Sequence, residues 1–142
     1  MSRDALPVLL RLRRFAVEAA QRELAAGLRA AAEAQHAQHT ARLAIARETA
    51  ATAQPVAGPV VLELFCRWLP HGQAAAEATD VAREAAEQGA EHSRAALATA
   101  HAAAEAVAVM RADRLRARRV MALRIEQAAL DEHAARGRHG AL

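Results

Sequence analysis

The fold of this chain is decided by Pro55-Val56-Ala57-Gly58-Pro59 and Pro70-His71-Gly72, two segments that interrupt an otherwise helix-favouring sequence. Proline cannot donate the backbone hydrogen bond that a helix interior requires, and glycine favours helix ends. The only other proline is Pro7, so the stretches on either side of the two segments can each form one helix. The sequence therefore predicts an all-α fold, a long antiparallel two-helix coiled-coil hairpin. We expect the first helix at about 4–54, a hinge at about 55–72, and the second helix at about 73–137.

The hinge carries the one dense apolar stretch of the chain, Val60 to Leu69, and we expect it to form a short helix of its own. Phe65 and Trp68 lie three residues apart, which places them on one face of that helix. They can cap the end of the hairpin, or they can form an anchor for a partner, since exposed aromatic residues dominate binding hot spots. The sequence leaves both interpretations open. Cys66 cannot form an internal disulfide, because it is the only cysteine, and we expect it to be buried.

Alanine supplies 43 of the 142 residues, and it accounts for most of the hydrophobic content. Alanine has the highest helix propensity and allows two helices to approach closely, so a thin helix pair is favoured over a thick core. We expect one elongated domain over residues 1–142. The longest apolar run is too short and too charged for a membrane span, and the first residues form no signal-peptide core. A cytoplasmic location is expected.

The first helix shows a heptad repeat. Leu10, Val17, Leu24, Ala31, Gln38 and Ile45 are spaced seven residues apart, and Ala20, Gly27, Ala34 and Ala41 follow members of that series by three residues. Such 3,4 spacing predicts one continuous contact face. Asp4 is the expected N-cap. In the second helix the rhythm is weaker, with Val107, Met110 and Met121 near one register and with Val81 and Leu97 as the larger anchors of an alanine-rich stretch.

Charge is distributed unevenly along the chain. Residues 71–110 hold six acidic residues and two arginines, whereas residues 111–142 hold eight arginines and four acidic residues. Folding about the centre of the hinge pairs residues whose numbers sum to about 127. This pairing places Arg11, Arg13 and Arg14 beside Arg111, Arg114, Arg116, Arg118 and Arg119, and the acidic stretch around Asp80 beside Arg42 and Arg47. We expect a basic tip at the open end, which suggests an acidic partner.

No pattern typical of an enzyme is present in the sequence. It contains no glycine-rich phosphate loop, no HExxH motif and no paired cysteines. His36 and His39 have helical spacing, but no further ligand completes a metal site. We expect no catalytic residues, no cofactor and no metal.

The run from Leu9 to Leu24, LLRLRRFAVEAAQREL, resembles the opening of the FliJ family of flagellar export proteins. Members of that family begin with a leucine- and arginine-rich run followed by a V-[DE]-x-A-x-x-x-L pattern, which Val17, Glu18, Ala20 and Leu24 match here. The resemblance implies a coiled-coil stalk that contacts the hexameric export ATPase FliI and the export gate protein FlhA. The YscO-type stalk proteins of injectisomes are similar.

On this interpretation the protein is a non-enzymatic stalk or adaptor of the flagellar type III export apparatus. The expected partner-binding residues are Leu9, Arg11, Leu12, Arg13, Arg14, Phe15, Arg111, Arg114, Arg118 and Arg119. One alternative is a nucleic-acid-binding helical protein, which a pI near 10.8 supports and a net charge of only +3 opposes. A homo-oligomeric scaffold coiled coil is the other alternative.

Overall fold

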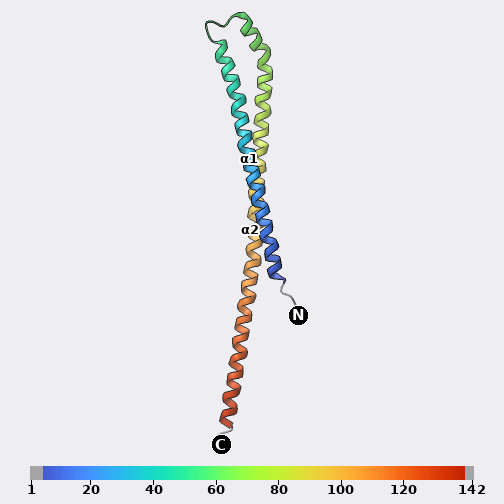
Figure 1. Cartoon of the computed structure of the whole chain (residues 1–142), viewed down its shortest axis with the longest axis vertical. Coiled ribbons are helices and arrows are strands. Elements are labelled where there is room, and N and C mark those ends of the chain that lie inside the picture. The colour runs from blue at the N-terminus through green and yellow to red at the C-terminus, as the bar shows by residue number, and fades with distance from the viewer. Residues whose placement is uncertain (1–4, 140–142) are drawn as a thin grey trace. The chain divides into compact units, whose positions relative to one another are not determined.

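A computed structural model describes residues 5–139, and over that range the chain is all-helical with no strand. Helix α1 spans Leu6–Thr52 and helix α2 spans Pro59–His139, and the two helices pack against each other (Figure 1). The predicted all-α fold is confirmed. The expected N-cap, Asp4, lies outside the described residues.

The contacts within the chain define two compact units, each containing part of both helices. One unit comprises residues 18–99, which include the loop between the helices. The other comprises residues 1–17 together with residues 100–142. The single domain expected from the sequence stays a prediction.

The separate hinge helix expected at about 55–72 is wrong, because α2 already begins at Pro59 and continues through Pro70. Proline is well tolerated at the first position of a helix, where its missing N–H would have no intrahelical partner. The Gly58 carbonyl accepts hydrogen bonds from the amides of Val61 and Leu62, which starts the helix. At Pro70 one internal hydrogen bond is lost, but the bonds on either side keep the helix continuous. The loop therefore contains only residues 53–58.

Within residues 18–99, small side chains let the two helices approach closely. A Cβ atom at Gly27 would lie 3.4 Å from the Cα of Ala90 and 3.6 Å from the Oγ of Ser93. Ala90 is buried, with 3% of its surface exposed. The heptad positions predicted for α1 in this unit, from Ala20 to Ile45, are all half-buried, whereas their neighbours except Ala44 are exposed. The contact face of α1 was thus predicted correctly.

The contact face of α2 in this unit follows the same 3,4 spacing. The residues that are buried or half-buried at that spacing are Phe65, Leu69, Gly72, Ala76, Thr79, Arg83, Ala86, Ala90, Ser93 and Leu97. Val81, expected from the sequence to be an anchor, lies outside this register and has 68% of its surface exposed. Five of these ten positions are glycine, alanine or serine, so side-chain size, on which Val81 was chosen, does not report the register of α2.

One polar cluster interrupts the alanine-rich contact. Asp80 accepts hydrogen bonds from the Gln38 amide at 2.5 Å and from the Arg42 guanidinium at 2.9 Å. These two hydrogen bonds, together with the charges of Arg42 and Arg83, hold the pKa of the Asp80 carboxyl below its usual value of 3.8. The pairing of Asp80 with Arg42 agrees with the sequence prediction. A polar residue at a heptad position such as Gln38 is a device that fixes the register of two helices.

Within the unit formed by residues 1–17 and 100–142, the core is small. Leu6, Leu10 and Val107 are buried against one another, and Ala108 packs against them. Each of the three has 5–6% of its surface exposed. This cluster holds the beginning of α1 against the middle of α2.

Candidate partner-binding surface

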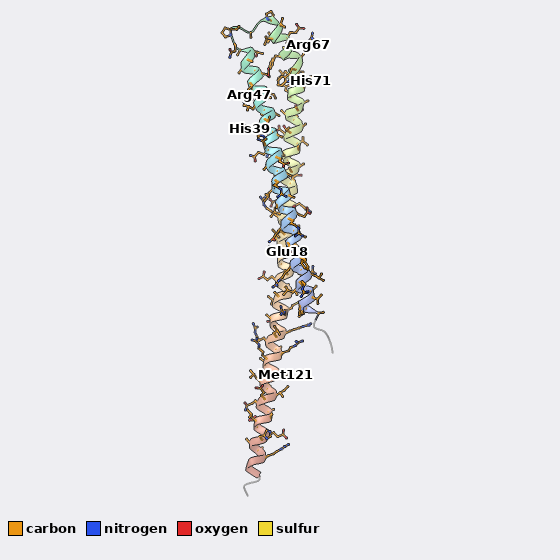
Figure 2. The ribbon with its side chains drawn as sticks, in the orientation of Figure 1. Glu18, His39, Arg47, Arg67, His71 and Met121 are labelled. Carbon is orange, nitrogen blue, oxygen red and sulfur yellow. The ribbon has the colours of Figure 1, made fainter. Side chains whose placement is uncertain are left out.

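The most exposed part of the described chain is the segment of α2 from Val109 to Gly137, which we call the α2 tail. Every residue in it is exposed, although the segment is helical throughout. Figure 1 draws it from orange to red, and Figure 2 labels Met121 on it. Because an isolated helix derives little stability from its own backbone, a long helix without buried residues is a candidate for a partner-binding segment.

The α2 tail combines large apolar side chains with arginines. Val109, Met110, Leu115, Val120, Met121, Leu123, Ile125 and Leu130 each expose 42–64% of their surface. The arginines of the same segment are Arg111, Arg114, Arg116, Arg118, Arg119, Arg124 and Arg136. Exposed apolar residues surrounded by positive charge are typical of a surface that binds an acidic protein.

The register between the helices differs from the one expected, and this difference changes the composition of the basic tip. Gly27 lies beside Ala90, and Leu10 packs against Val107. The residue numbers of positions that face each other on α1 and α2 therefore sum to about 117. The expected sum of 127 was wrong because the chain folds back at residues 53–58, earlier than the centre of the predicted hinge. Each α1 residue therefore faces an α2 residue about ten positions earlier in the sequence than the one predicted.

As a consequence, the two arginine groups predicted to meet do not lie side by side. At a sum of 117, Arg11, Arg13 and Arg14 lie level with residues 103–106 of α2. Leu6, at the start of α1, contacts the cluster around Val107. Arg114 and Arg119 lie further along α2, beyond the level of Leu6. The predicted single tip is replaced by two separate basic segments in this unit.

The residues predicted near the chain start are accessible. Leu9, Leu12 and Phe15 expose 37%, 59% and 56% of their surface. Arg11, Arg13 and Arg14 are exposed as well. Leu10 within this segment and Leu6 just before it pack against α2, so the outward side of the segment carries both apolar residues and arginines.

On the α2 tail, Arg111, Arg114, Arg118 and Arg119 are exposed as a partner-binding role requires. Arg116 forms an ion pair of 3.1 Å with Asp113. Asp113, Arg116, Ala117, Val120, Met121 and Arg124 line a surface hollow of about 410 Å³. The hollow offers an apolar floor between two arginines, which suits an apolar side chain next to a carboxylate.

Phe65 and Trp68 are half-buried rather than fully exposed. Their ring centroids lie 6.2 Å apart, and both rings line a hollow of about 290 Å³ with Glu48, Ala51, Thr52, Val61 and Leu64. The indole of Trp68 covers Gly72, where a Cβ atom would come within 2.7 Å of the ring. The rings therefore cover the loop end of the helix pair, while part of their surface stays open. Cys66 is exposed, contrary to expectation, because it lies off the contact face.

Among residues 5–139 no group of three or more His, Cys, Asp or Glu side chains could hold a metal ion. Within the same range no helix has the length and apolar character needed to cross a membrane.

No binding role was predicted for the apolar residues of the α2 tail, namely Val109, Leu115, Val120, Leu123, Ile125 and Leu130, which are exposed. Their periodicity alone does not reveal them, because they lie on several sides of the helix. The available signal was length, since the second helix was predicted to be longer than the first and its end could have no counterpart on α1.

Comparison of the chain with protein-family models, with curated proteins and with solved structures finds no match.

Proposed function

We propose that this protein is a non-enzymatic coiled-coil adaptor, a stalk of a flagellar type III export apparatus that engages the export ATPase ring through the α2 tail. In this proposal the helix pair is an antiparallel coiled-coil hairpin. The observation that carries the proposal is the α2 tail itself, a long exposed helix bearing large apolar side chains and seven arginines.

The coiled-coil assignment is supported by the spacing of buried positions. Both helices bury residues at alternating intervals of three and four, which is the spacing of a heptad repeat. The polar cluster of Gln38, Arg42 and Asp80 then holds one register. A stalk requires such a fixed register, because a helix pair that slips cannot present its tail at a defined position.

The assignment to flagellar export rests on the resemblance of residues 9–24 to the FliJ family, with Val17, Glu18, Ala20 and Leu24 matching its pattern. The α2 tail is compatible with that assignment. A hexameric ATPase ring with acidic surfaces offers the charge that the arginines of the tail complement. Contact with the export gate would follow from the same resemblance.

The experiment measures ATP hydrolysis by the cognate export ATPase with and without the protein. We expect the protein to stimulate hydrolysis or ring assembly, and to hydrolyse no ATP alone. The variant Arg111→Glu/Arg119→Glu reverses two charges of the tail and is expected to lose most of the stimulation, because attractive charge pairs at the interface become repulsive.

The matched control is Arg22→Glu/Arg29→Glu, which makes the same charge change at two exposed positions of α1 in the other unit. It should retain stimulation. Equal loss in both double variants would mean that net charge alone matters. Absence of stimulation by the unmodified protein, together with DNA binding tighter than the non-specific range of about 10⁻⁴ to 10⁻⁶ M, would replace the proposal with a nucleic-acid function.

A further inference from the structure

The heptad spacing of α2 does not stop where its contact with α1 ends. In the unit that contains the tail, Ala100, Ala104 and Val107 are the buried or half-buried positions at 3,4 spacing. The same spacing continues along the tail through Arg111, Arg114, Arg118, Met121, Ile125, Ala128 and Glu132. The face that contacts α1 near Val107 thus extends into the tail, where all of its residues are exposed.

The residues on this extended face are arranged in a self-complementary order. In antiparallel coiled coils each layer pairs one heptad position with the other, as Leu10 and Val107 do within the chain. If two tails pack antiparallel about a centre near residue 123, the residue numbers of facing positions sum to 246. Met121 then lies opposite Ile125 of a second copy, and Arg114 lies opposite Glu132. Both apolar residues, now 59% and 64% exposed, become covered.

Charge segregation within the tail favours the same arrangement. Residues 111–124 contain six arginines and the single acid Asp113, whereas residues 125–137 contain three acids and one arginine, Arg136, which pairs with Glu132 of its own chain. An antiparallel crossing lays the basic half of one tail on the acidic half of the other. A parallel crossing would place Arg114 and Arg118 next to the same residues of the second copy, and like charges so placed repel.

We propose that the α2 tail binds the α2 tail of a second copy of this chain, antiparallel and centred near residue 123. Two Met121–Ile125 contacts form its apolar centre, and two Arg114–Glu132 pairs flank them. The Arg124 side chains of the two copies lie close together near the centre. Repulsion between these two positive charges keeps the dimer weak and reversible. Gly137, near the end of α2, allows the last turn to bend away from the start of the other copy's α1.

This inference does not depend on the proposed export function, but it has a consequence for it. The dimer covers the same tail that the ATPase would bind. Self-association and partner binding therefore compete, and the dimer is a resting form that the partner takes apart.

The test uses the full chain with Cys66→Ser, so that each added cysteine is the only one. Ala122→Cys lies beside the centre of the crossing and is expected to form a disulfide-linked dimer under mild oxidation. Leu123→Cys, one residue away on the opposite side of the helix, is the matched control and should remain monomeric. Ala128→Cys should also remain monomeric, because an antiparallel crossing places it opposite residue 118 of the second copy.

Equal cross-linking of Ala122→Cys and Leu123→Cys, or none for either, would overturn the proposal. Strong cross-linking of Ala128→Cys would overturn the antiparallel direction, since a parallel pair brings that position against itself. The second measurement is sedimentation equilibrium. Arg114→Glu and Glu132→Arg should each weaken the dimer by about fivefold or more, and the double swap should restore it. A double swap no better than the single variants, or a monomer at concentrations up to about 1 mM, would also overturn it.

Discussion

The helix contact within residues 18–99 and the α2 tail have opposite compositions. In the contact, the buried and half-buried positions are mostly alanine, glycine and serine, as at Gly27, Ala90 and Ser93. On the tail, the exposed positions include valine, leucine, isoleucine and methionine. Large apolar side chains give more free energy on burial than alanine does, at roughly 0.8 kcal/mol for each CH₂ group. The tail therefore leaves eight large apolar side chains exposed, and their burial would contribute more free energy than that of alanine.

Different interactions therefore stabilise the helix contact and the α2 tail. The contact depends on close approach and on a few larger residues at defined places, so changes there should affect the stability of the fold. The tail has no buried residue, and in the free protein helix propensity and pairs within the helix such as Arg116–Asp113 stabilise it, so changes to its exposed apolar residues should affect binding. Variants of the contact and of the tail should therefore differ in whether folding stability or partner binding changes.

Leu10→Ala should have the largest effect on stability. Leu10 is one of three buried residues that hold the start of α1 against α2, with 5% of its surface exposed. Its truncation leaves a cavity, and we expect a loss of about 2–3 kcal/mol in the free energy of unfolding, measured by urea denaturation. Leu12→Ala is the control, because Leu12 is 59% exposed, and it should change stability by less than about 0.5 kcal/mol. Similar losses for both would contradict the assigned contact face.

Gly27→Leu should destabilise the helix pair by about 1–3 kcal/mol, because a side chain larger than a methyl group would push Ala90 away. A Cβ atom there already lies in contact with the Ala90 backbone. Gly89→Leu is the matched control, since it introduces the same side chain in a helix with nothing within 4 Å. It should be neutral or stabilising, because leucine has a higher helix propensity than glycine. Thermal melting of the two variants compares them, and a stable Gly27→Leu variant would show that the helices are further apart.

The polar cluster predicts a smaller effect that depends on pH. The folded pKa of Asp80 is lowered, so its contribution is present above the unfolded value of 3.8 and is lost as the pH falls through the folded value. At pH 7 Asp80→Asn should melt below the unmodified protein. The difference should shrink as the pH drops below about 4, where Asp80 itself becomes neutral. A difference that stays constant from pH 7 to pH 2 would mean that the Asp80 charge contributes nothing.

The smallest effect on stability is expected on the tail. Leu123→Ser replaces a residue that is 64% exposed, and the free energy of unfolding should change by less than about 0.5 kcal/mol. The same variant should reduce binding to the ATPase in the assay described above, because exposed apolar residues become buried at an interface. A clear loss of cooperative unfolding in this variant would show that the tail is packed in the free protein.

The helices and the α1 contact face could be predicted because local signals determine them. Alanine content favours helices, Pro55 and Gly58 interrupt them, and the heptad from Val17 to Ile45 places one face of α1 inside. The loop could be placed only approximately, since Pro59 and Pro70 are both compatible with a helix end, and only the folded chain shows that Pro59 starts a helix and Pro70 lies within one. That ambiguity shifted the predicted register by about ten residues.

The exposure of the tail arginines agrees with the sequence prediction, and their role in binding a partner stays a prediction. Arg111, Arg114, Arg118 and Arg119 were selected for their charge, and their exposure agrees with that choice. The apolar residues of the tail were missed, because a leucine or an isoleucine in a helical sequence is expected to be inside. Whether such a residue is buried depends on the register of the partner helix, which no local pattern in α2 reports.

Amide hydrogen exchange on the free protein measures whether the α2 tail is a helix with no buried residue. The protein should be dilute, so that tails do not pair. We expect slow exchange at the contact positions between residues 24 and 45 and between 76 and 97, and much faster exchange between residues 113 and 135, because a helix without tertiary packing opens easily. Added ATPase should slow exchange in the tail alone. Equal protection of the tail and the contact in the dilute free protein would contradict the account.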